Sequence, residues 1–126
     1  MIQNSKSFAS EHFTIEELQC KCGCGLMKVQ QRAIEILERA RVLYNKPIHI
    51  ASAFRCAKRN FEIGGKPGSA HLTGWAFDPI KPEGGEDTWN LLQAFIKAGF
   101  FGFGYGNGKI HFDIDPVHGP RSWTYP

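Results

Sequence analysis

The 126-residue sequence lacks any long hydrophobic run, and it contains no internal repeat and no low-complexity tract. Because a membrane-spanning helix needs about 18–20 consecutive apolar residues, the sequence predicts no transmembrane segment and no membrane partner. Residues 1–10 also lack the apolar stretch of a secretory signal peptide. We therefore expect a protein that is cytoplasmic as synthesised.

An excess of charge of one sign is also missing. The chain carries 15 lysine and arginine residues against 12 acidic ones, a net charge of +3, and these charges are scattered. Without a basic stripe we expect no nucleic-acid partner, and an anionic polymer is only weakly indicated. The length and the 42% content of hydrophobic residues are typical of one globular domain over residues 1–126, which we expect to be monomeric.

Cysteine is scarce but clustered, with four residues in all, Cys20, Cys22, Cys24 and Cys56. They form no Cys-x-x-Cys pair, the spacing most typical of zinc knuckles, yet four thiols suffice for a second, structural zinc site. A disulfide from Cys56 to the cluster and four free thiols are the alternatives. Because no signal peptide is visible, we favour reduced thiols or a thiol–metal site over a disulfide.

Local patterns predict three helices. Thr14 and Glu17 fit a capping box that opens a short helix. Apolar residues recur at helical spacing over 29–44. Asp87 or Thr88 is expected to cap a further long helix that Gly99 ends.

The remaining patterns predict strands and turns. The segment 20–25, rich in cysteine and glycine, is expected to be a loop. Strands are predicted over 48–53, 75–78, 101–105 and 109–115, the last two joined by a glycine-rich hairpin turn. This order of elements implies a small α+β domain, with a mostly antiparallel sheet and flanking helices.

His71, Asp78 and His111 are the strongest candidates for a functional site. Asp78 ends one predicted strand, His71 lies in the loop before it, and His111 lies on another strand. Neighbouring strands can therefore present all three side chains to one point. Two neutral imidazoles and one carboxylate suit a catalytic zinc ion, since they leave a fourth position for water. The alternative is two unrelated histidines and an aspartate that caps a turn.

The segment from Ser69 to Asp78, Ser-Ala-His-Leu-Thr-Gly-Trp-Ala-Phe-Asp, resembles the Ser-x-His-x-x-Gly-x-Ala-x-Asp signature of the zinc D-Ala-D-Ala carboxypeptidase family. All five fixed positions are met, and His111 in Ile-His-Phe-Asp matches the third zinc ligand. That family includes phage endolysins that cut L-Ala-D-Glu bonds, and its fold is shared with the Hedgehog signalling domain. Further matches follow the family's order along nearly the whole chain: His12-Phe13-Thr14, the segment 20–25, Ala51 to Cys56, Asn60 with Gly64-Gly65, and Arg121-Ser122-Trp123.

The resemblance implies a Hedgehog-like and DD-peptidase-like fold with one catalytic Zn²⁺ held by His71, Asp78 and His111. It implies hydrolysis of peptide bonds in peptidoglycan stem peptides, by a carboxypeptidase or an endolysin-type endopeptidase. The likeness is greatest to short single-domain members from phages, prophages and bacteria. Without a signal peptide, such a protein would reach the cell wall through a phage holin or on a virion.

The resemblance also implies roles around the metal. Arg55, in a Ser-x-x-Arg pattern, matches the arginine that binds the substrate carbonyl or the oxyanion, a task that suits a planar guanidinium. Ser69 either hydrogen-bonds the substrate or orients the loop that carries His71. Trp123 is expected to wall the substrate groove, with core packing as the alternative.

The general base is where the sequence departs from the family. Active relatives place an acidic residue or a histidine a few positions before the last zinc histidine, whereas residues 105–110 contain neither. Asp113, Asp115 or Glu83 could supply the acid, and Asp113 is alternatively the partner of a ligand histidine. Tyr105 could instead donate to the tetrahedral intermediate. A zinc-binding module for cell-wall peptides that has lost catalysis is therefore the alternative function.

Overall fold

The computed structural model describes residues 7–126. Residues 1–6, part of the segment searched for a signal peptide, lie outside the described residues. The described chain forms four helices and five strands, in the order α1 (Ile15–Leu18), α2 (Gln31–Tyr44), β1 (Ile50–Ser52), α3 (Ala57–Glu62), β2 (Ala76–Pro79), α4 (Gly85–Ala98), β3 (Gly102–Gly106), β4 (Lys109–Asp113) and β5 (Arg121–Thr124).

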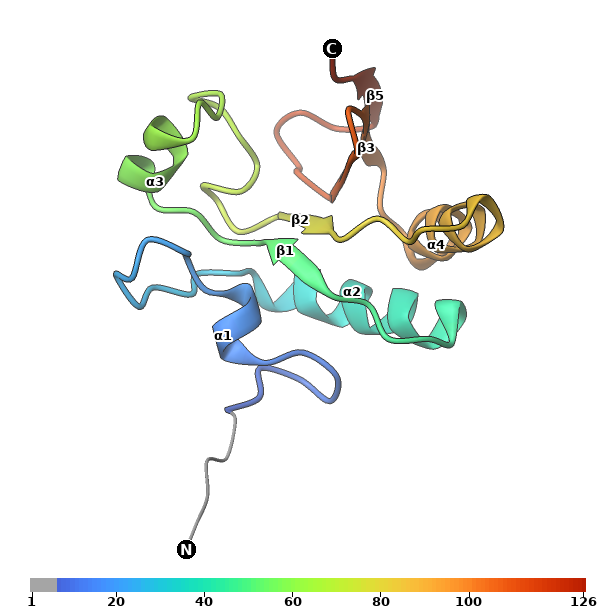
Figure 1. Cartoon of the computed structure of the whole chain (residues 1–126). Helices are drawn as coiled ribbons and strands as arrows, with labels where there is room; N and C mark the ends of the chain where they lie inside the picture. The colour runs from blue at the N-terminus through green and yellow to red at the C-terminus, as the bar shows by residue number, and fades with distance from the viewer. Residues whose placement is uncertain (1–6) are drawn as a thin grey trace, which may run out of the picture.

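The five strands form one sheet in the order β1-β2-β4-β3-β5. All neighbouring pairs are antiparallel except β3 and β5, which are parallel. Helices α2 and α4 lie on one side of the sheet, while α3 and the loop that follows it lie on the other (Figure 1). The fold is therefore α+β with a mostly antiparallel sheet, as predicted.

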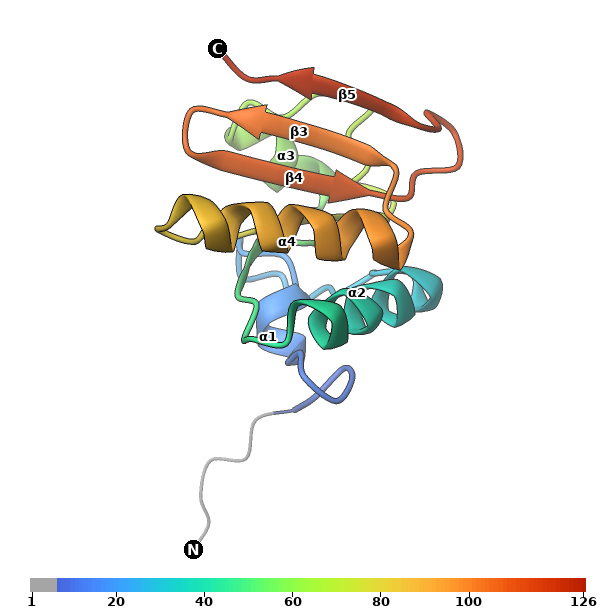
Figure 2. The same ribbon diagram turned by 90° about the vertical axis from the view of Figure 1, so that its right-hand side faces the viewer.

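The hydrophobic core lies between the sheet and helices α2 and α4, with α4 running alongside the strands in Figure 2. Alternation along β2 and β4 directs Phe77 and Phe112 toward this core. The ring of Phe95 on α4 stacks on Phe112 with 4.2 Å between centroids. Each fully buried phenylalanine stabilises the fold by about 1.5–3 kcal/mol. The opposite strand positions, among them Asp78 and His111, are consequently free to face away from the core.

The hairpin that carries His111 has the turn that its sequence predicts. Asn107 and Gly108, between β3 and β4, have φ values of 52° and 72°. Two successive residues with positive φ are typical of the type I′ turn, whose twist matches that of the flanking strands. The turn sets the register in which His111 lies opposite Gly104.

Three expectations about elements need correction. Helix α4 begins at Gly85, so Asp87 and Thr88 lie in its first turn and neither is the cap. The Thr88 hydroxyl instead donates to the carbonyl of Gly84 at 2.9 Å. Helix α3 and strand β5 were not predicted, since one is only six residues long and the other pairs only with a distant strand. In the first helix, Thr14 caps as expected, but Glu17 accepts from the Ile50 amide.

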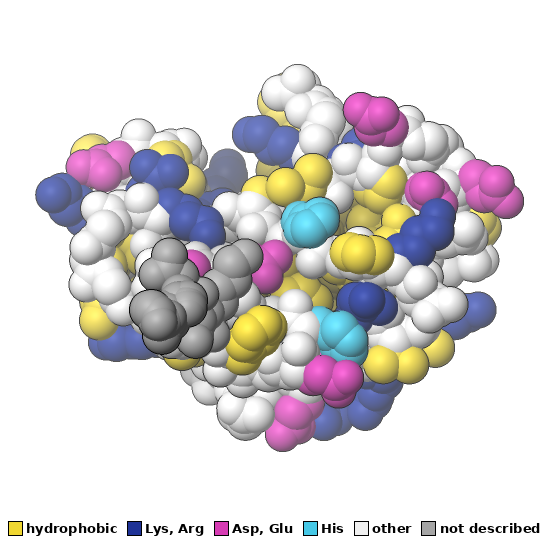
Figure 3. Space-filling view, turned by 60° about the horizontal axis from the view of Figure 1, so that its bottom comes forward, with side chains coloured by type: hydrophobic (Ala, Val, Ile, Leu, Met, Phe, Trp, Pro, Cys, Tyr) yellow, Lys and Arg dark blue, Asp and Glu magenta, His cyan; other side chains and the backbone are white. Residues whose placement is uncertain are grey.

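Charges of both signs are interspersed among neutral and hydrophobic side chains on the face shown in Figure 3. This agrees with the scattered charges of the sequence. Among the described residues, no helix is both long enough and apolar enough to span a membrane.

Candidate metal centre

The three predicted metal ligands come together on the sheet face opposite the core. Atom Oδ1 of Asp78 lies 3.1 Å from Nε2 of His71 and 3.0 Å from Nδ1 of His111. Both histidines are buried, and the Asp78 side chain is 26% exposed. One carboxylate oxygen and two ring nitrogens thus face a common point that is open on one side, as a catalytic zinc site requires.

In both His71 and His111, a hydrogen bond from the ring nitrogen that faces away from Asp78 fixes the tautomer. Nδ1 of His71 lies 2.6 Å from the carbonyl oxygen of Ala53, which can only accept, so this nitrogen carries the proton. Nε2 of His111 lies 2.6 Å from Oδ2 of Asp113 and donates to that carboxylate. The lone pairs on Nε2 of His71 and Nδ1 of His111 are left for a metal ion, so the residues present fit zinc.

The electrostatics keep both carboxylates charged. Burial raises the pKa of Asp78, but His71 and His111 lower it by more and hold it well below its usual range. Burial also raises the pKa of Asp113, while hydrogen bonds from His111 and Arg121 lower it to about 2. Burial lowers the pKa of His111, but its two carboxylate partners raise it above the usual value.

Arg55 is held beside the metal ligands by three contacts. Its Nη2 lies 3.1 Å from Oδ2 of Asp78, the oxygen that does not face the histidines. Nε donates to the hydroxyl of Ser52 at 3.0 Å, and Nη1 donates to the buried side chain of Asn60 at 3.2 Å. The guanidinium is therefore fixed in place next to Asp78 and on the lining of the cleft.

Gly102 and Gly104 on β3 leave space for the side chains of Asp113 and Trp123 beside the site. A Cβ atom at Gly104 would lie 2.6 Å from the Trp123 ring, and one at Gly102 would overlap the carboxylate of Asp113. The Trp123 ring lies over Gly104, with its centroid 5.0 Å from that of His111. The alternating Gly-x-Gly pattern is thus the local sequence feature that lets β5 place Trp123 against a candidate ligand.

The site lies in a cleft of about 1240 Å³ between the loop after α3 and the end of the sheet that carries β5. Its lining contains Arg55, Ser69, His71, Asp78, His111 and Trp123 from the predicted set. Arg121 also lines it but is paired with the buried carboxylate of Asp113, as Arg55 is paired with Asp78. Three further lysines, Lys66, Lys81 and Lys109, line the cleft without an ion-pair partner among the described residues, so the cleft has a cationic character.

Two lining residues were not singled out from the sequence. His118, in the loop between β4 and β5, makes a close hydrogen bond through Nδ1 to the buried carboxylate of Asp115. Tyr125 follows β5, and burial raises the pKa of its hydroxyl, which lies within the electrostatic influence of Asp78 and Arg55. The spacing Asp115-Pro-Val-His118 would have been the signal for the first residue, whereas the second has no local signal.

Of the other predicted residues, Ser69 lines the cleft, whereas Tyr105 and Glu83 do not. Ser69 accepts a hydrogen bond from the amide of His71 at 3.2 Å, which matches the loop-orienting interpretation. Tyr105 lies outside the cleft, because alternation along β3 places its ring beside Phe103, on the face opposite the glycines. This geometry gives no support to the expectation that Tyr105 donates to a reaction intermediate. Glu83 is exposed and does not line the cleft.

Asp113 lies behind His111 and not in the cleft. Its side chain is fully buried, and both oxygens are occupied by His111 and Arg121. This arrangement favours the interpretation in which Asp113 orients a ligand histidine over the one in which it is the general base.

Comparison with known proteins points to one family. A family model described as Peptidase M15 matches residues 11–115, which include all three candidate ligands and Arg55. Comparison with curated proteins gave no match.

Proposed function

Because the chain belongs to the peptidase M15 family, we propose that it hydrolyses peptide bonds in peptidoglycan stem peptides, next to D-residues. Family membership supports a zinc-dependent metallopeptidase, and the proposal specifies its substrate. The observation that carries it is the convergence of His71, Asp78 and His111 in a cleft of about 1240 Å³. Carboxypeptidase and endolysin-type endopeptidase action both fit this cleft.

His71, Asp78 and His111 would hold the zinc ion, which when bound supplies Lewis acidity toward the scissile carbonyl and acidifies water. Arg55 is positioned to donate to the oxygen of that carbonyl as negative charge develops on it. Its three contacts preorganise the guanidinium, so that little reorganisation is needed during the reaction.

We further propose His118 as the group that takes and returns the proton. Among the described residues that line the cleft, His71, Asp78 and His111 are committed to the metal, and the remaining imidazole is His118. Asp115 accepts from Nδ1 of His118, which leaves Nε2 as the proton acceptor. Asp115, one of the acids named as a possible base, would then act through His118.

The charge of the cleft supports an acidic peptide. Peptidoglycan stem peptides carry several carboxylates, and three lysines, Lys66, Lys81 and Lys109, line the cleft without an ion-pair partner among the described residues. Such complementarity favours association with acidic peptides and disfavours basic ones. The hydroxyl of Tyr125 offers a further donor beside Arg55.

The test is release of new amino groups from purified peptidoglycan. Wild-type protein is expected to release them, to stop after zinc is chelated, and to recover when zinc is restored. His71→Ala should be inactive, while His49→Ala, an exposed histidine outside the cleft, should remain active. Bound zinc without release of amino groups would overturn the proposed hydrolase activity and favour a peptide-binding module. The specific observation behind that alternative is the absence of an acidic residue or a histidine at positions 105–110, before His111.

A further inference from the structure

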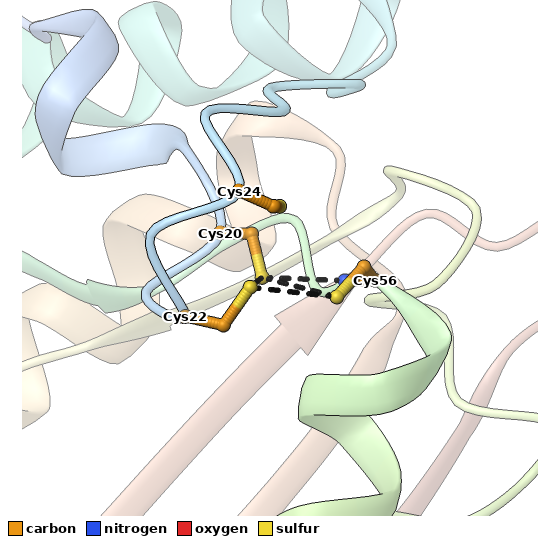
Figure 4. Close-up of side chains that lie close together, drawn as sticks. All are labelled: Cys20, Cys22, Cys24 and Cys56. Carbon is orange, nitrogen blue, oxygen red and sulfur yellow. Dashed lines mark hydrogen bonds between the residues drawn. The ribbon is translucent and has the colours of Figure 1, made fainter.

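We propose that Cys20, Cys22, Cys24 and Cys56 form a second, structural zinc site, separate from the candidate metal centre. The first three thiols lie on the loop that follows α1, and the fourth lies just before α3 (Figure 4). These segments are far apart in the sequence and meet only in the folded protein. The inference goes beyond the proposed hydrolysis and does not depend on it.

The distances between the sulfur atoms match a tetrahedral metal site. Cys20 Sγ lies 3.5 Å from Cys22 Sγ and 3.7 Å from Cys56 Sγ, and the last two are 3.6 Å apart. Cys24 joins them, with all four ligand atoms within 4.8 Å of one another. A tetrahedron with zinc–sulfur bonds of about 2.3 Å has edges of about 3.8 Å. Three nearly equal distances therefore outline one face of such a tetrahedron.

The same geometry disfavours a disulfide. A disulfide joins two sulfurs at about 2 Å and leaves the others without a partner. Here Cys20 is nearly equidistant from Cys22 and Cys56, and none of the four is paired in a disulfide. Four soft thiol ligands, three of them at the spacing of a tetrahedron face and the fourth within 4.8 Å, favour zinc over hard cations such as magnesium or calcium.

The backbone around the cluster is arranged as a metal-binding loop requires. Gly23 and Gly25 have φ values of 92° and 79°, in the left-handed region that suits glycine, so the chain turns tightly enough for alternate residues to point inward. The amide of Cys56 points at Cys20 Sγ at 3.4 Å, and the amide of Arg59 points at Cys56 Sγ at 3.5 Å. Amide donors to sulfur stabilise the negative charge of thiolate ligands.

This position gives the site a specific task. Cys56 follows Arg55 directly and caps α3, after which the chain forms one wall of the cleft. A zinc ion held by four protein ligands has no open position and stabilises the fold without taking part in chemistry. It would fix Cys56 to the loop after α1 and thereby hold Arg55 against Asp78.

Zinc content and cobalt spectra test the proposal without an activity assay. The full chain, purified anaerobically with a reductant, is expected to hold two zinc ions, measured by elemental analysis and by native mass spectrometry. The double variant His71→Ala, His111→Ala should keep one. Titrated with Co²⁺, that variant should show an intense thiolate-to-cobalt charge-transfer band. Cys24→Ser should weaken this band, and Cys22→His should keep the ion with an altered spectrum.

Lys28→Ser, an exposed residue of the same loop, serves as the matched control and should leave zinc content and spectrum unchanged. If Cys24→Ser does not fold, native mass spectrometry of the wild type still decides the question. A single zinc ion with four thiols reactive toward a thiol reagent in the folded protein would overturn the second site, as would a mass lower by two hydrogens. If the histidine variant loses one of the two zinc ions and retains the cobalt–thiolate band, the thiol site is intact whatever the histidine site does. Failure of the catalytic site is thereby distinguished from failure of this one.

Discussion

Arg121 and Asp113 form a two-point ion pair, with Nη1–Oδ1 and Nη2–Oδ2 distances that are both 3.0 Å. Asp113 is fully buried and also accepts from His111. The arginine therefore compensates a buried charge that in turn fixes the orientation of a candidate zinc ligand. Its effect on the metal is transmitted through Asp113, so Arg121 is a positioning residue in this respect.

Asp113→Asn should lower the affinity for zinc at the histidine site by about 10–100-fold, because the amide orients His111 less well and loses the charge partner of Arg121. Competition with a chelator of known affinity measures the change. Asp115→Asn alters the charge of a neighbouring buried carboxylate that does not contact His111, so it serves as the control. Equal zinc affinity in wild type and Asp113→Asn would argue against the orienting role.

Arg55→Lys should reduce kcat by about 100-fold and leave zinc content unchanged, because lysine keeps the charge but loses the fork that contacts Ser52, Asn60 and Asp78. Steady-state kinetics on a soluble stem peptide provides the measurement. Arg59→Lys, the same change one turn away on α3, should retain activity. A KM effect with kcat preserved would place Arg55 in substrate binding alone.

His118→Gln should lower kcat by about 100–10,000-fold with two zinc ions still bound, since a general base typically contributes that much. Steady-state kinetics of peptide hydrolysis on a soluble stem peptide is the measurement, with His49→Gln, an exposed histidine outside the cleft, as the control. If kcat is preserved in His118→Gln, another group accepts the proton.

Glu38→Gln should destabilise the protein by about 1 kcal/mol at pH 7, the typical worth of one hydrogen bond. Burial raises the pKa of Glu38, but hydrogen bonds from Ser10 and His12 lower it by more, to below 4.5. A depressed folded-state pKa gives stability that is present above 4.5 and is lost as the pH falls through the folded value.

Urea unfolding between pH 7 and pH 3 should therefore show the wild type and Glu38→Gln converging at the acidic end. Glu35→Gln, an exposed position on the same helix, should change the free energy of unfolding by much less. A gap between wild type and Glu38→Gln that stays constant over this pH range would contradict the assignment.

Gly104→Ala should destabilise the fold by about 1–3 kcal/mol and reduce activity, because the new methyl group meets the Trp123 ring beside His111. Gly85→Ala, where a Cβ would have open space, should be neutral or stabilising by about 0.5–1 kcal/mol. Thermal denaturation and peptidoglycan assays on both variants provide the measurement. Normal activity in Gly104→Ala would show that the Trp123 position is not critical.

The sequence by itself determined the features that depend on local patterns. The signature from Ser69 to Asp78 and the later His111 identified the candidate metal ligands, and helical periodicity identified the core-facing helix α2. The pair Asn107-Gly108 determined the hairpin, because its two positive φ values select one turn type. Residue identity and spacing were sufficient in each of these cases.

Tertiary structure decided the features that depend on which strands are neighbours. β5 pairs with β3 across a long connection, and only that pairing brings Arg121 to Asp113 and Trp123 to His111. The face of β3 decided that Tyr105 lies outside the cleft, and the loop before β5 brought His118 into it. The four cysteines were visible as a set, but the approach of their sulfur atoms to within 4.8 Å of one another required the loop after α1 to lie beside the start of α3. Contacts between distant segments follow from the packing of the whole domain, which local spacing does not encode.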